Sequence, residues 1–400
     1  MFSFLKNPHI KWSVICIVRT ALKVFYIFPV KKKRILFTSF SGKQFSCNPK
    51  YIFEYLYEKY NREMECIWCI SNISILPEKY RGYIKTVRRF SVAHIKLAVT
   101  SGIIIGNYGF PAWLPKRKKQ IFINTWHGGG AYKKVGNTKT EMQFSFFIEK
   151  AVRYSSDNTD FFISSCRKFS EVIHEDLYIP NNRFLNIGMP RNDIFFDRER
   201  MRVLSAMVKQ KLNISVEKSL VLYAPTYRGS NTEGGFNVLF QNDFISRLVD
   251  LFAHKFGKDF IFLYRGHLLG GNVEAEDVMD VSLYPDMQEL LCAVDVLITD
   301  YSSSMWDFSF AGKPGFLYVP DIDEYRAERG LHTDVETWPF SCARTESELL
   351  QKIDAWTPSL QVEKNKAHHN LFESYENGHA SEKICQLIED IVKNNMSETS

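Results

Sequence analysis

Short apolar runs that each end in a cluster of polar residues recur along this 400-residue chain, and they constrain its fold more than any other feature. The runs are rich in β-branched and aromatic residues, and stretches with helical spacing separate them. Strands that alternate with helices in this way form mainly parallel sheets covered by helices. We predict strands at residues 35–40, 66–70, 103–107, 121–125, 161–164 and 184–188, and then at residues 220–224, 260–264, 278–281, 296–299 and 316–319. With 45% hydrophobic residues, the chain has enough apolar material for two α/β domains.

The most informative strand end is the sequence VLITDYSSSMWD at residues 296–307. An apolar strand runs into Thr299 and Asp300, and then into serines that open a predicted helix, among them Ser302 and Ser303. The first N–H groups of a helix and the positive end of its dipole bind phosphate. Serines also cap helices that bind no ligand. The pattern therefore predicts a phosphate site, with a structural cap as the alternative.

Four other predicted strands end in comparable polar sequences. These are WHGGGAYKK at residues 126–134, GMPRND at 188–193, APTYR at 224–228 and RGH at 265–267. In open α/β sheets the carboxyl ends of the strands line the ligand crevice. We therefore expect these polar ends to converge in space although they lie far apart in sequence.

The order of these motifs resembles that of the CDP-glycerol glycerophosphotransferases, a family that makes teichoic-acid and capsule polymers. The resemblance extends from about residue 35 to residue 332. It implies a GT-B-like α/β fold, in which two Rossmann-like domains face a central cleft. It also implies transfer of glycerol phosphate, or a related polyol phosphate, from a CDP-activated donor to a hydroxyl of a lipid-linked or polymer acceptor, with release of CMP.

Two positions depart from the family's pattern. One extra residue precedes Lys133, and Leu268 stands where a proline often follows the histidine. Both changes fall near the expected acceptor loop. They leave the reaction class in place. The sequence does not decide whether the polyol is glycerol or ribitol, whether the enzyme is a primase or a polymerase, or whether the product is teichoic acid or capsule.

The resemblance also implies roles for individual residues. His127 is the expected general base, with a structural histidine as the alternative, and His267 is expected to donate a proton or hydrogen bond to the departing CMP. The implied donor-binding residues are Arg228, Thr226, Arg265, Thr299, Asp300, Ser302 and Ser303. The implied acceptor or loop residues are Gly128, Lys134, Arg191 and Asp193.

Charge qualifies two of these assignments. Asp300 would repel a phosphate, so we expect it to orient His267 or a backbone turn. Arg191 and Asp193 either position the acceptor or pair with each other as a loop brace. No HExxH, strand-end DxD or Walker loop is present, so we predict transfer without a metal or another cofactor. A GT-B glycosyltransferase that uses a nucleotide sugar, and a membrane-surface scaffold without activity, are the alternative functions.

Residues 1–34 hold eight Lys or Arg and no Asp or Glu, whereas the whole chain carries a net charge of +6. On a helical wheel the cationic residues Lys11, Arg19 and Lys23 cluster on one side, which leaves an apolar face that includes Trp12 and Val18. This pattern predicts an amphipathic helix that attaches peripherally to an anionic membrane surface. A helix docked on the protein itself and a signal anchor are the alternatives. We accordingly divide the chain into residues 1–34, an acceptor domain at 35–205, and a donor domain with C-terminal helices at 206–400.

The eight cysteines form no disulfide framework. Cys66 and Cys69 fall within one predicted strand, which places their sulfurs on opposite faces and argues against a zinc or redox site. We therefore predict a reducing compartment, at the cytoplasmic face of the cell membrane. Basic groups at residues 81–89, with helical spacing, and at 116–119 either extend the membrane surface, guide a polyanionic polymer or are solvated. Their pattern does not resemble a nucleic-acid-binding motif.

Overall fold

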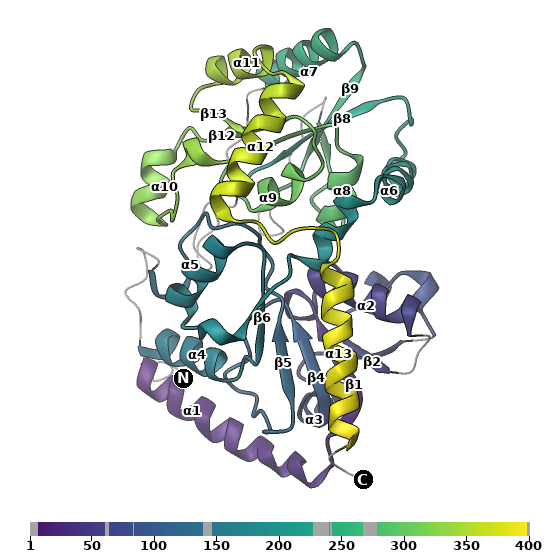
Figure 1. Ribbon diagram of the computed structural model, residues 1–400, viewed down its shortest axis with the longest axis vertical. Helices are drawn as coiled ribbons and strands as arrows, with labels where there is room; N and C mark the ends of the chain where they lie inside the picture. Colours follow the sequence, from purple (N-terminus) through teal and green to yellow (C-terminus); the bar gives the residue numbers. More distant parts are fainter. Residues whose placement is uncertain are drawn as a thin grey trace. The chain divides into compact units, whose positions relative to one another are not determined.

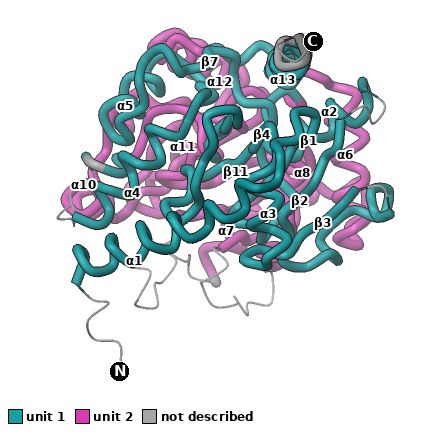
Figure 2. The backbone as a smooth tube through the Cα atoms, turned by 90° about the horizontal axis from the view of Figure 1, so that it is seen from below, with its two compact units in different colours: residues 1–127, 134–193, 375–400 teal, residues 128–133, 194–374 magenta. Residues whose placement is uncertain are grey.

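The computed structural model describes residues 7–60, 64–82, 84–138, 146–226, 240, 242–266 and 278–397. The chain divides into two compact units, which Figure 2 colours separately. Unit 1 comprises residues 1–127, 134–193 and 375–400, and unit 2 comprises residues 128–133 and 194–374. The chain therefore leaves unit 1 directly after His127 and returns to it at Lys134.

Unit 1 contains a parallel seven-stranded sheet in the order β3-β2-β1-β4-β5-β6-β7. Its strands are β1 (Lys31–Thr38), β2 (Glu65–Cys69), β3 (Lys85–Val87), β4 (Ser101–Gly106), β5 (Ile121–Asn124), β6 (Phe161–Ser164) and β7 (Phe184–Asn186). The strand order reverses between β1 and β4, where such sheets bind ligands at their carboxyl ends. Side chains at the centre of this sheet, such as Phe37 and Ile105, are fully buried.

Helices of unit 1 pack on this sheet and at its edges (Figure 1). They are α1 (Pro8–Ala21), α2 (Cys47–Lys59), α3 (Val92–Thr100), α4 (Phe146–Asp157), α5 (Arg167–Leu177) and α13 (Ala380–Ser397). Helix α1 begins with a cap because the side chain of Asn7 accepts hydrogen bonds from two backbone N–H groups, and Pro8 occupies the first turn, where no N–H is needed.

Unit 2 repeats the same topology with six parallel strands, in the order β10-β9-β8-β11-β12-β13. The strands are β8 (Ser219–Ala224), β9 (Phe260–Tyr264), β10 (Val278–Asp280), β11 (Val296–Thr299), β12 (Gly315–Tyr318) and β13 (Ser341–Ala343). The helices are α6 (Arg198–Lys211), α7 (Asn242–Phe256), α8 (Met287–Ala293), α9 (Ser304–Ser309), α10 (Ile322–Glu328), α11 (Glu346–Asp354) and α12 (Pro358–Phe372). The strand order reverses here between β8 and β11.

Short 3-10 helices lie between these elements. They are η2 (Leu22–Ile27), η3 (Phe40–Gly42), η4 (Ile73–Ile75), η5 (Glu78–Tyr80), η6 (Gly136–Thr138), η7 (Asn181–Arg183), η8 (Pro190–Phe196) and η9 (Val335–Thr337). The prediction of two Rossmann-like sheets is confirmed, and each predicted strand is present. Strands β3 and β13 were not predicted, because their sequences, KTV and SCA, contain no apolar run; both lie at an edge of their sheet.

The division between the units differs from the predicted domains. Residues 375–400 belong to unit 1 and not to the second half of the chain, and the boundary between the halves follows Asp193. Helix α13 packs against α2 and β1, where Ile384, Ile388 and Val392 are buried. An apolar stripe predicts that a helix packs, but it does not say on which sheet.

Helix α1 docks on unit 1 with a side that carries both Trp12 and Arg19, while Lys11 and Lys23 are exposed; the Trp12 ring meets Phe147 of α4 edge-on. Arg19 Nη1 donates a hydrogen bond to the Ala112 carbonyl at 3.1 Å, and its guanidinium lies 4.0 Å from the centre of the Tyr154 ring. The apolar residues Ile17, Val24 and Ile27, on α1 and η2, are instead 68%, 63% and 77% exposed. Trp12 of the predicted apolar face therefore packs on the protein, as the alternative of a docked helix expects, and these exposed aliphatic side chains occupy other positions.

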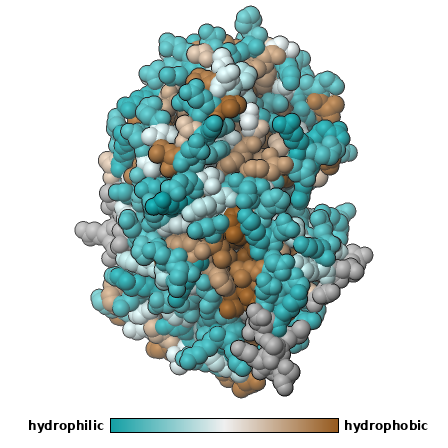
Figure 3. All heavy atoms as spheres, in the orientation of Figure 1, coloured by the Kyte–Doolittle hydropathy of each residue, from teal (hydrophilic) through white to brown (hydrophobic). Residues whose placement is uncertain are grey.

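Figure 2 shows α1 along the periphery of unit 1, and hydrophobic spheres mark parts of the lower edge of Figure 3, where α1 and η2 lie. Across the described residues, no helix combines the length and the hydropathy that crossing a bilayer requires.

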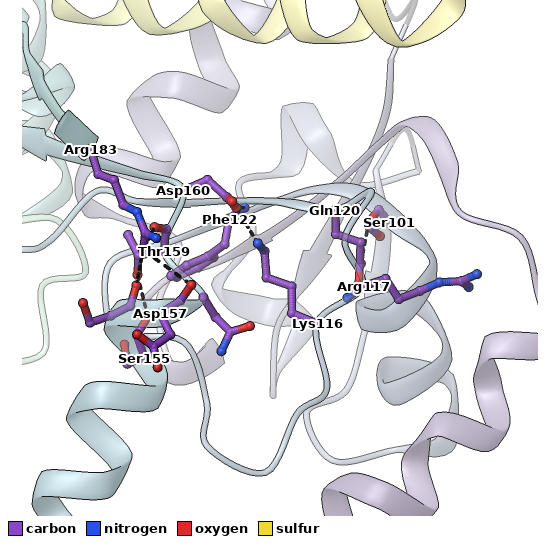
Figure 4. A network of polar contacts seen from close by, with 12 residues as sticks. Ser101, Lys116, Arg117, Gln120, Phe122, Ser155, Asp157, Thr159, Asp160 and Arg183 are labelled. Atoms are coloured by element: carbon purple, nitrogen blue, oxygen red, sulfur yellow. Dashed lines mark hydrogen bonds and ion pairs between the residues drawn. The ribbon is translucent and has the colours of Figure 1, made fainter. Parts of the chain in front are cut away.

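Several members of the two further basic groups have partners within unit 1, while Lys118 and Lys119 are exposed. Lys85 lies in β3, which excludes the predicted helical spacing, and its ammonium is 3.0 Å from Glu65. Lys116 forms an ion pair of 2.7 Å with Asp160, whose carboxylate also accepts the N–H of Phe122 (Figure 4). Arg117 donates a hydrogen bond to the Phe28 carbonyl. These cations therefore have partners within the unit.

Candidate active site

His127 lies just beyond the carboxyl end of β5, next to the point where the strand order of unit 1 reverses. Its Nδ1 is 2.8 Å from the backbone oxygen of Asn107, the first residue after β4. A carbonyl oxygen can only accept, so Nδ1 carries the hydrogen and the neutral ring has its lone pair on Nε2. A fixed tautomer of this kind prepares Nε2 to take a proton.

The backbone that carries His127 adopts an unusual conformation. Trp126 has a φ of 51°, in the left-handed region that costs most L-residues free energy. The Asn124 side chain accepts the Trp126 N–H at 3.0 Å. The Asn48 amide donates to the carbonyls of Thr125 and Trp126, at 2.9 and 3.2 Å. The first turn of α2 therefore supports the loop that presents His127.

Arg191 and Asp193 both lie in unit 1 and contact different parts of it. Arg191 is buried, and its Nη1 donates a hydrogen bond of 2.7 Å to the His127 carbonyl. Asp193 accepts the N–H groups of Ala380 and Ser381 at the start of α13, at 2.9 and 2.7 Å. Burial raises the pKa of the Asp193 carboxyl, although these N–H groups oppose the shift. Arg191 therefore supports the loop of His127, and Asp193 caps α13.

The glycines after His127 belong to unit 2 and serve close packing there. Gly128 is buried, and a Cβ on Gly129 would lie 2.1 Å from Cδ1 of Trp306. The Tyr132 hydroxyl is 2.9 Å from Nε2 of His368, and Lys133 forms an isolated bridge with Leu331. Lys134, back in unit 1, is half-buried.

In unit 2, Thr226 and Asp300 lie at the carboxyl ends of the adjacent strands β8 and β11. The buried Asp300 carboxylate accepts the Thr226 N–H at 2.9 and 2.8 Å, and the Thr226 hydroxyl at 2.7 Å. Asp300 therefore fixes the turn that follows β8.

The hydroxyls predicted to hold phosphate differ in their positions. Thr299 is fully buried and donates to the Ala224 carbonyl at 2.7 Å, which ties β11 to β8. Ser302 Oγ accepts the N–H of Ser304 at 3.3 Å, while Ser303 is half-buried directly before α9. This geometry revises the assignment of Thr299, whose hydroxyl is engaged within the sheet.

Arg265 follows β9, and its guanidinium Nη1 is buried without a hydrogen-bond partner among the described residues. Burial lowers the pKa of Arg265 to about 10, while Asp286 and Tyr284 oppose the shift. A buried polar group without a partner is rare in folded proteins, and a phosphate oxygen is a strong acceptor for a guanidinium. Arg265 is thus suited to binding an anion.

Arg228 and His267 lie outside the described residues. Within the described ranges, no three His, Cys, Asp or Glu side chains gather as a metal site would require. The sequence did not point to Asn48, because its amide reaches His127's loop from a distant helix; the Asn-Pro pair at its position signals only a turn. It did not point to Asn107 either, because that residue acts through its backbone.

Solved structures with this arrangement include those of the wall teichoic acid polymerase TagF. One matches with a TM-score of 0.80 and 28% identity, and covers 97% of each chain. A TagF variant soaked with CDPG matches with a TM-score of 0.81 and 26% identity, over 99% of this chain and 100% of that one.

Similar sequences have related names. A teichoic acid poly(glycerol phosphate) polymerase from Staphylococcus epidermidis is 30% identical over 91% of this chain, which spans about half, 51%, of that protein. A protein of the same name from Bacillus spizizenii is 30% identical over 91% of this chain and 94% of its own length. Residues 20–390 match the family of CDP-glycerol:poly(glycerophosphate) glycerophosphotransferases. Because this match covers nearly the whole chain, the protein belongs to that family.

Proposed function

We propose that this protein transfers glycerol phosphate, or a closely related polyol phosphate, from a CDP-linked donor to a hydroxyl of a lipid-linked or polymer acceptor in teichoic-acid synthesis. Its family and the names of its relatives support the reaction class. The observation that carries the catalytic part is the hydrogen bond from His127 Nδ1 to the Asn107 carbonyl, which leaves the basic lone pair on Nε2.

In the proposed reaction, His127 Nε2 takes the proton of the acceptor hydroxyl while its oxygen attacks the distal phosphorus of the donor. A new P–O bond forms, the bond between that phosphorus and the oxygen of CMP breaks, and CMP leaves with the bonding electrons. His267 is proposed to donate a proton or hydrogen bond to CMP. The positive charge of Arg265 stabilises the phosphate oxygens as charge develops on them.

The proposed donor site lies in unit 2 at the carboxyl ends of β8, β9 and β11. Arg265 supplies a buried cation, and Ser302 and Ser303 supply hydroxyls. Arg228 and Thr226 remain proposed donor-binding positions, although the Thr226 hydroxyl donates its hydrogen to Asp300. Asp300 holds the turn of Thr226 in place. Gly128 and Lys134 remain the proposed acceptor or loop positions.

A first test measures CMP release from CDP-glycerol and, separately, from CDP-ribitol, with a lipid-linked disaccharide as acceptor. We expect release with one donor, and His127→Ala should lower kcat by roughly 10²- to 10⁴-fold, the usual contribution of a general base. His174→Ala is the matched control, because His174 Nδ1 lies 2.7 Å from the Ile179 carbonyl in the same unit. Addition of EDTA to the assay tests the prediction that no metal ion is needed.

The reaction class would be wrong if neither CDP donor turned over while a UDP-sugar did, which would indicate a glycosyltransferase. If CMP were released and His127→Ala retained the rate of His174→Ala, the reaction class would stand but the assignment of the base would fail.

We also propose that α1 and η2 hold the protein on the cytoplasmic face of an anionic membrane. Ile17, Val24 and Ile27 form an exposed aliphatic stripe, and eight cations without a single carboxylate lie in residues 1–34. Apolar side chains beside cations favour the interface of an anionic bilayer, where each cation contributes about 1 kcal/mol.

A further inference from the structure

The loop of His127 is held by a buried amide that the reaction does not use. Asn48 is completely buried at the start of α2, and its Nδ2 donates to the carbonyls of Thr125 and Trp126. Its Oδ1 accepts the backbone N–H of Arg191 at 3.1 Å. One side chain thus binds the two residues before His127 and the residue whose guanidinium holds the His127 carbonyl.

The need for such support follows from the backbone. Trp126 has a positive φ, a conformation that persists at a non-glycine residue only when its surroundings enforce it. If Trp126 relaxed to an ordinary φ, the peptide before His127 would rotate, and the ring would move away from the Asn107 carbonyl. The tautomer of His127 therefore depends on the contacts that hold Trp126.

We propose that Asn48 is a positioning residue for His127, acting on the 125–127 backbone directly and through Arg191. The inference rests on the proposed role of His127 as the base, but its structural part can be tested without turnover. Asn48 contacts neither donor nor acceptor in this proposal. Its effect is to keep Nδ1 hydrogen-bonded and Nε2 basic.

The chain offers a matched control in Gln120, which Figure 4 shows. Gln120 is also completely buried in unit 1, its Nε2 donates to the carbonyls of Ala98 and Ser101 at 2.8 and 2.7 Å, and its Oε1 accepts the Arg117 N–H at 3.1 Å. Asn48 and Gln120 therefore bind the same kinds of backbone groups, but Gln120 does so at the amino end of β5, away from His127.

The experiment compares Asn48→Ala with Gln120→Ala in the full chain, by kinetics and by ¹⁵N NMR of labelled histidine rings. The His127 signal is identified by its absence in His127→Ala. We expect Asn48→Ala to lower kcat by roughly 10- to 100-fold with little change in the donor KM, as a displaced catalytic group does. The His127 ring should change from the Nδ1–H tautomer to a mixture. Gln120→Ala should keep both the kcat and the His127 tautomer of the wild type, even if its melting temperature falls as far as that of Asn48→Ala.

Three results would overturn the proposal: an unchanged His127 tautomer in Asn48→Ala, an unchanged kcat, or an equal loss of kcat in Gln120→Ala. Where Asn48→Ala fails to fold, the uncharged variant Asn48→Ser is read in the same way, because its hydroxyl has one hydrogen and can donate to only one of the two carbonyls. Retained activity in His127→Ala would instead contradict the role of His127 as the base. The NMR result would still decide whether Asn48 positions the His127 ring.

Discussion

At the scale of single residues, burial decides which ionisable groups keep a charge. His368 is buried in α12, with Nδ1 2.8 Å from the Thr337 carbonyl and Nε2 2.9 Å from the Tyr132 hydroxyl. Burial lowers the pKa of His368 to about 3, although the bond to Thr337 opposes the shift. Nδ1 therefore donates to the carbonyl, and neutral Nε2 accepts from Tyr132.

Because His368 is buried in its neutral form, we expect the protein to lose stability in acid. Between about pH 4 and about pH 6 the unfolded chain protonates His368 while the folded chain does not, so the free energy of unfolding falls as the pH falls. His368→Gln should reduce that slope by up to about 1.4 kcal/mol per pH unit. Urea unfolding of both proteins across this range measures the slope. Parallel curves for the two proteins would contradict the prediction.

Unlike His368, Arg265 keeps its charge in a buried position, where its Nη1 has no hydrogen-bond partner in the described chain. We expect Arg265→Met to raise the KM for the CDP donor by roughly 10- to 100-fold, because a charged hydrogen bond contributes about 1.5–3 kcal/mol. The melting temperature should fall at the same time, because the buried Asp286 carboxylate loses the positive charge near it, so KM is the deciding readout.

The control for Arg265→Met is Arg326→Met, which removes an exposed ion pair with Asp334 in the same unit. It should leave KM unchanged. A lower melting temperature with an unchanged KM in Arg265→Met would show that Arg265 is structural.

At the scale of elements, α1 is packed on one side and aliphatic on the other. His9 stacks on Phe146 of α4 at 4.1 Å, while Ile17, and Val24 of the following η2, are exposed. A soluble surface rarely gathers exposed aliphatic side chains without a partner. One side of α1 therefore packs on the protein, and the other side is suited to contact lipid.

We expect the double variant Ile17→Glu and Ile27→Glu to bind vesicles of phosphatidylcholine and phosphatidylglycerol at least about tenfold more weakly, because apolar burial is lost and two negative charges are added. Leu283→Glu, at an exposed aliphatic residue of unit 2, should bind as the wild type does. Co-sedimentation with the vesicles measures the effect. Equal binding of all three proteins would exclude α1 as the membrane contact.

At the scale of the whole molecule, the chain returns to its first unit at the end. Ile388 of α13 and Ile353 of α11 are both fully buried, but they belong to units 1 and 2 respectively. Each unit therefore has a core that can be perturbed separately.

We expect Ile388→Ala to destabilise unit 1 by about 2–5 kcal/mol, the usual cost of such a cavity. Hydrogen exchange should increase in α2 and β1, against which α13 packs, and not in β11. Ile353→Ala should give the reverse pattern. Faster exchange in β11 of Ile388→Ala would indicate that the C-terminal helix stabilises unit 2 instead.

The sequence by itself determined every strand except β3 and β13, the polar ends of the predicted strands, and the family, because each of these is read from residues that are continuous in the chain. A strand pattern and the residues just after it are continuous in sequence, so His127, Arg265 and Thr226 could be placed at strand ends. The tertiary structure alone decided that Asn48 and Asn107 hold His127, that Thr299 faces a strand, and that α13 returns to unit 1. These facts depend on backbone carbonyls and buried faces that meet across long separations, and the identity of a residue does not reveal which distant group its backbone or side chain will meet.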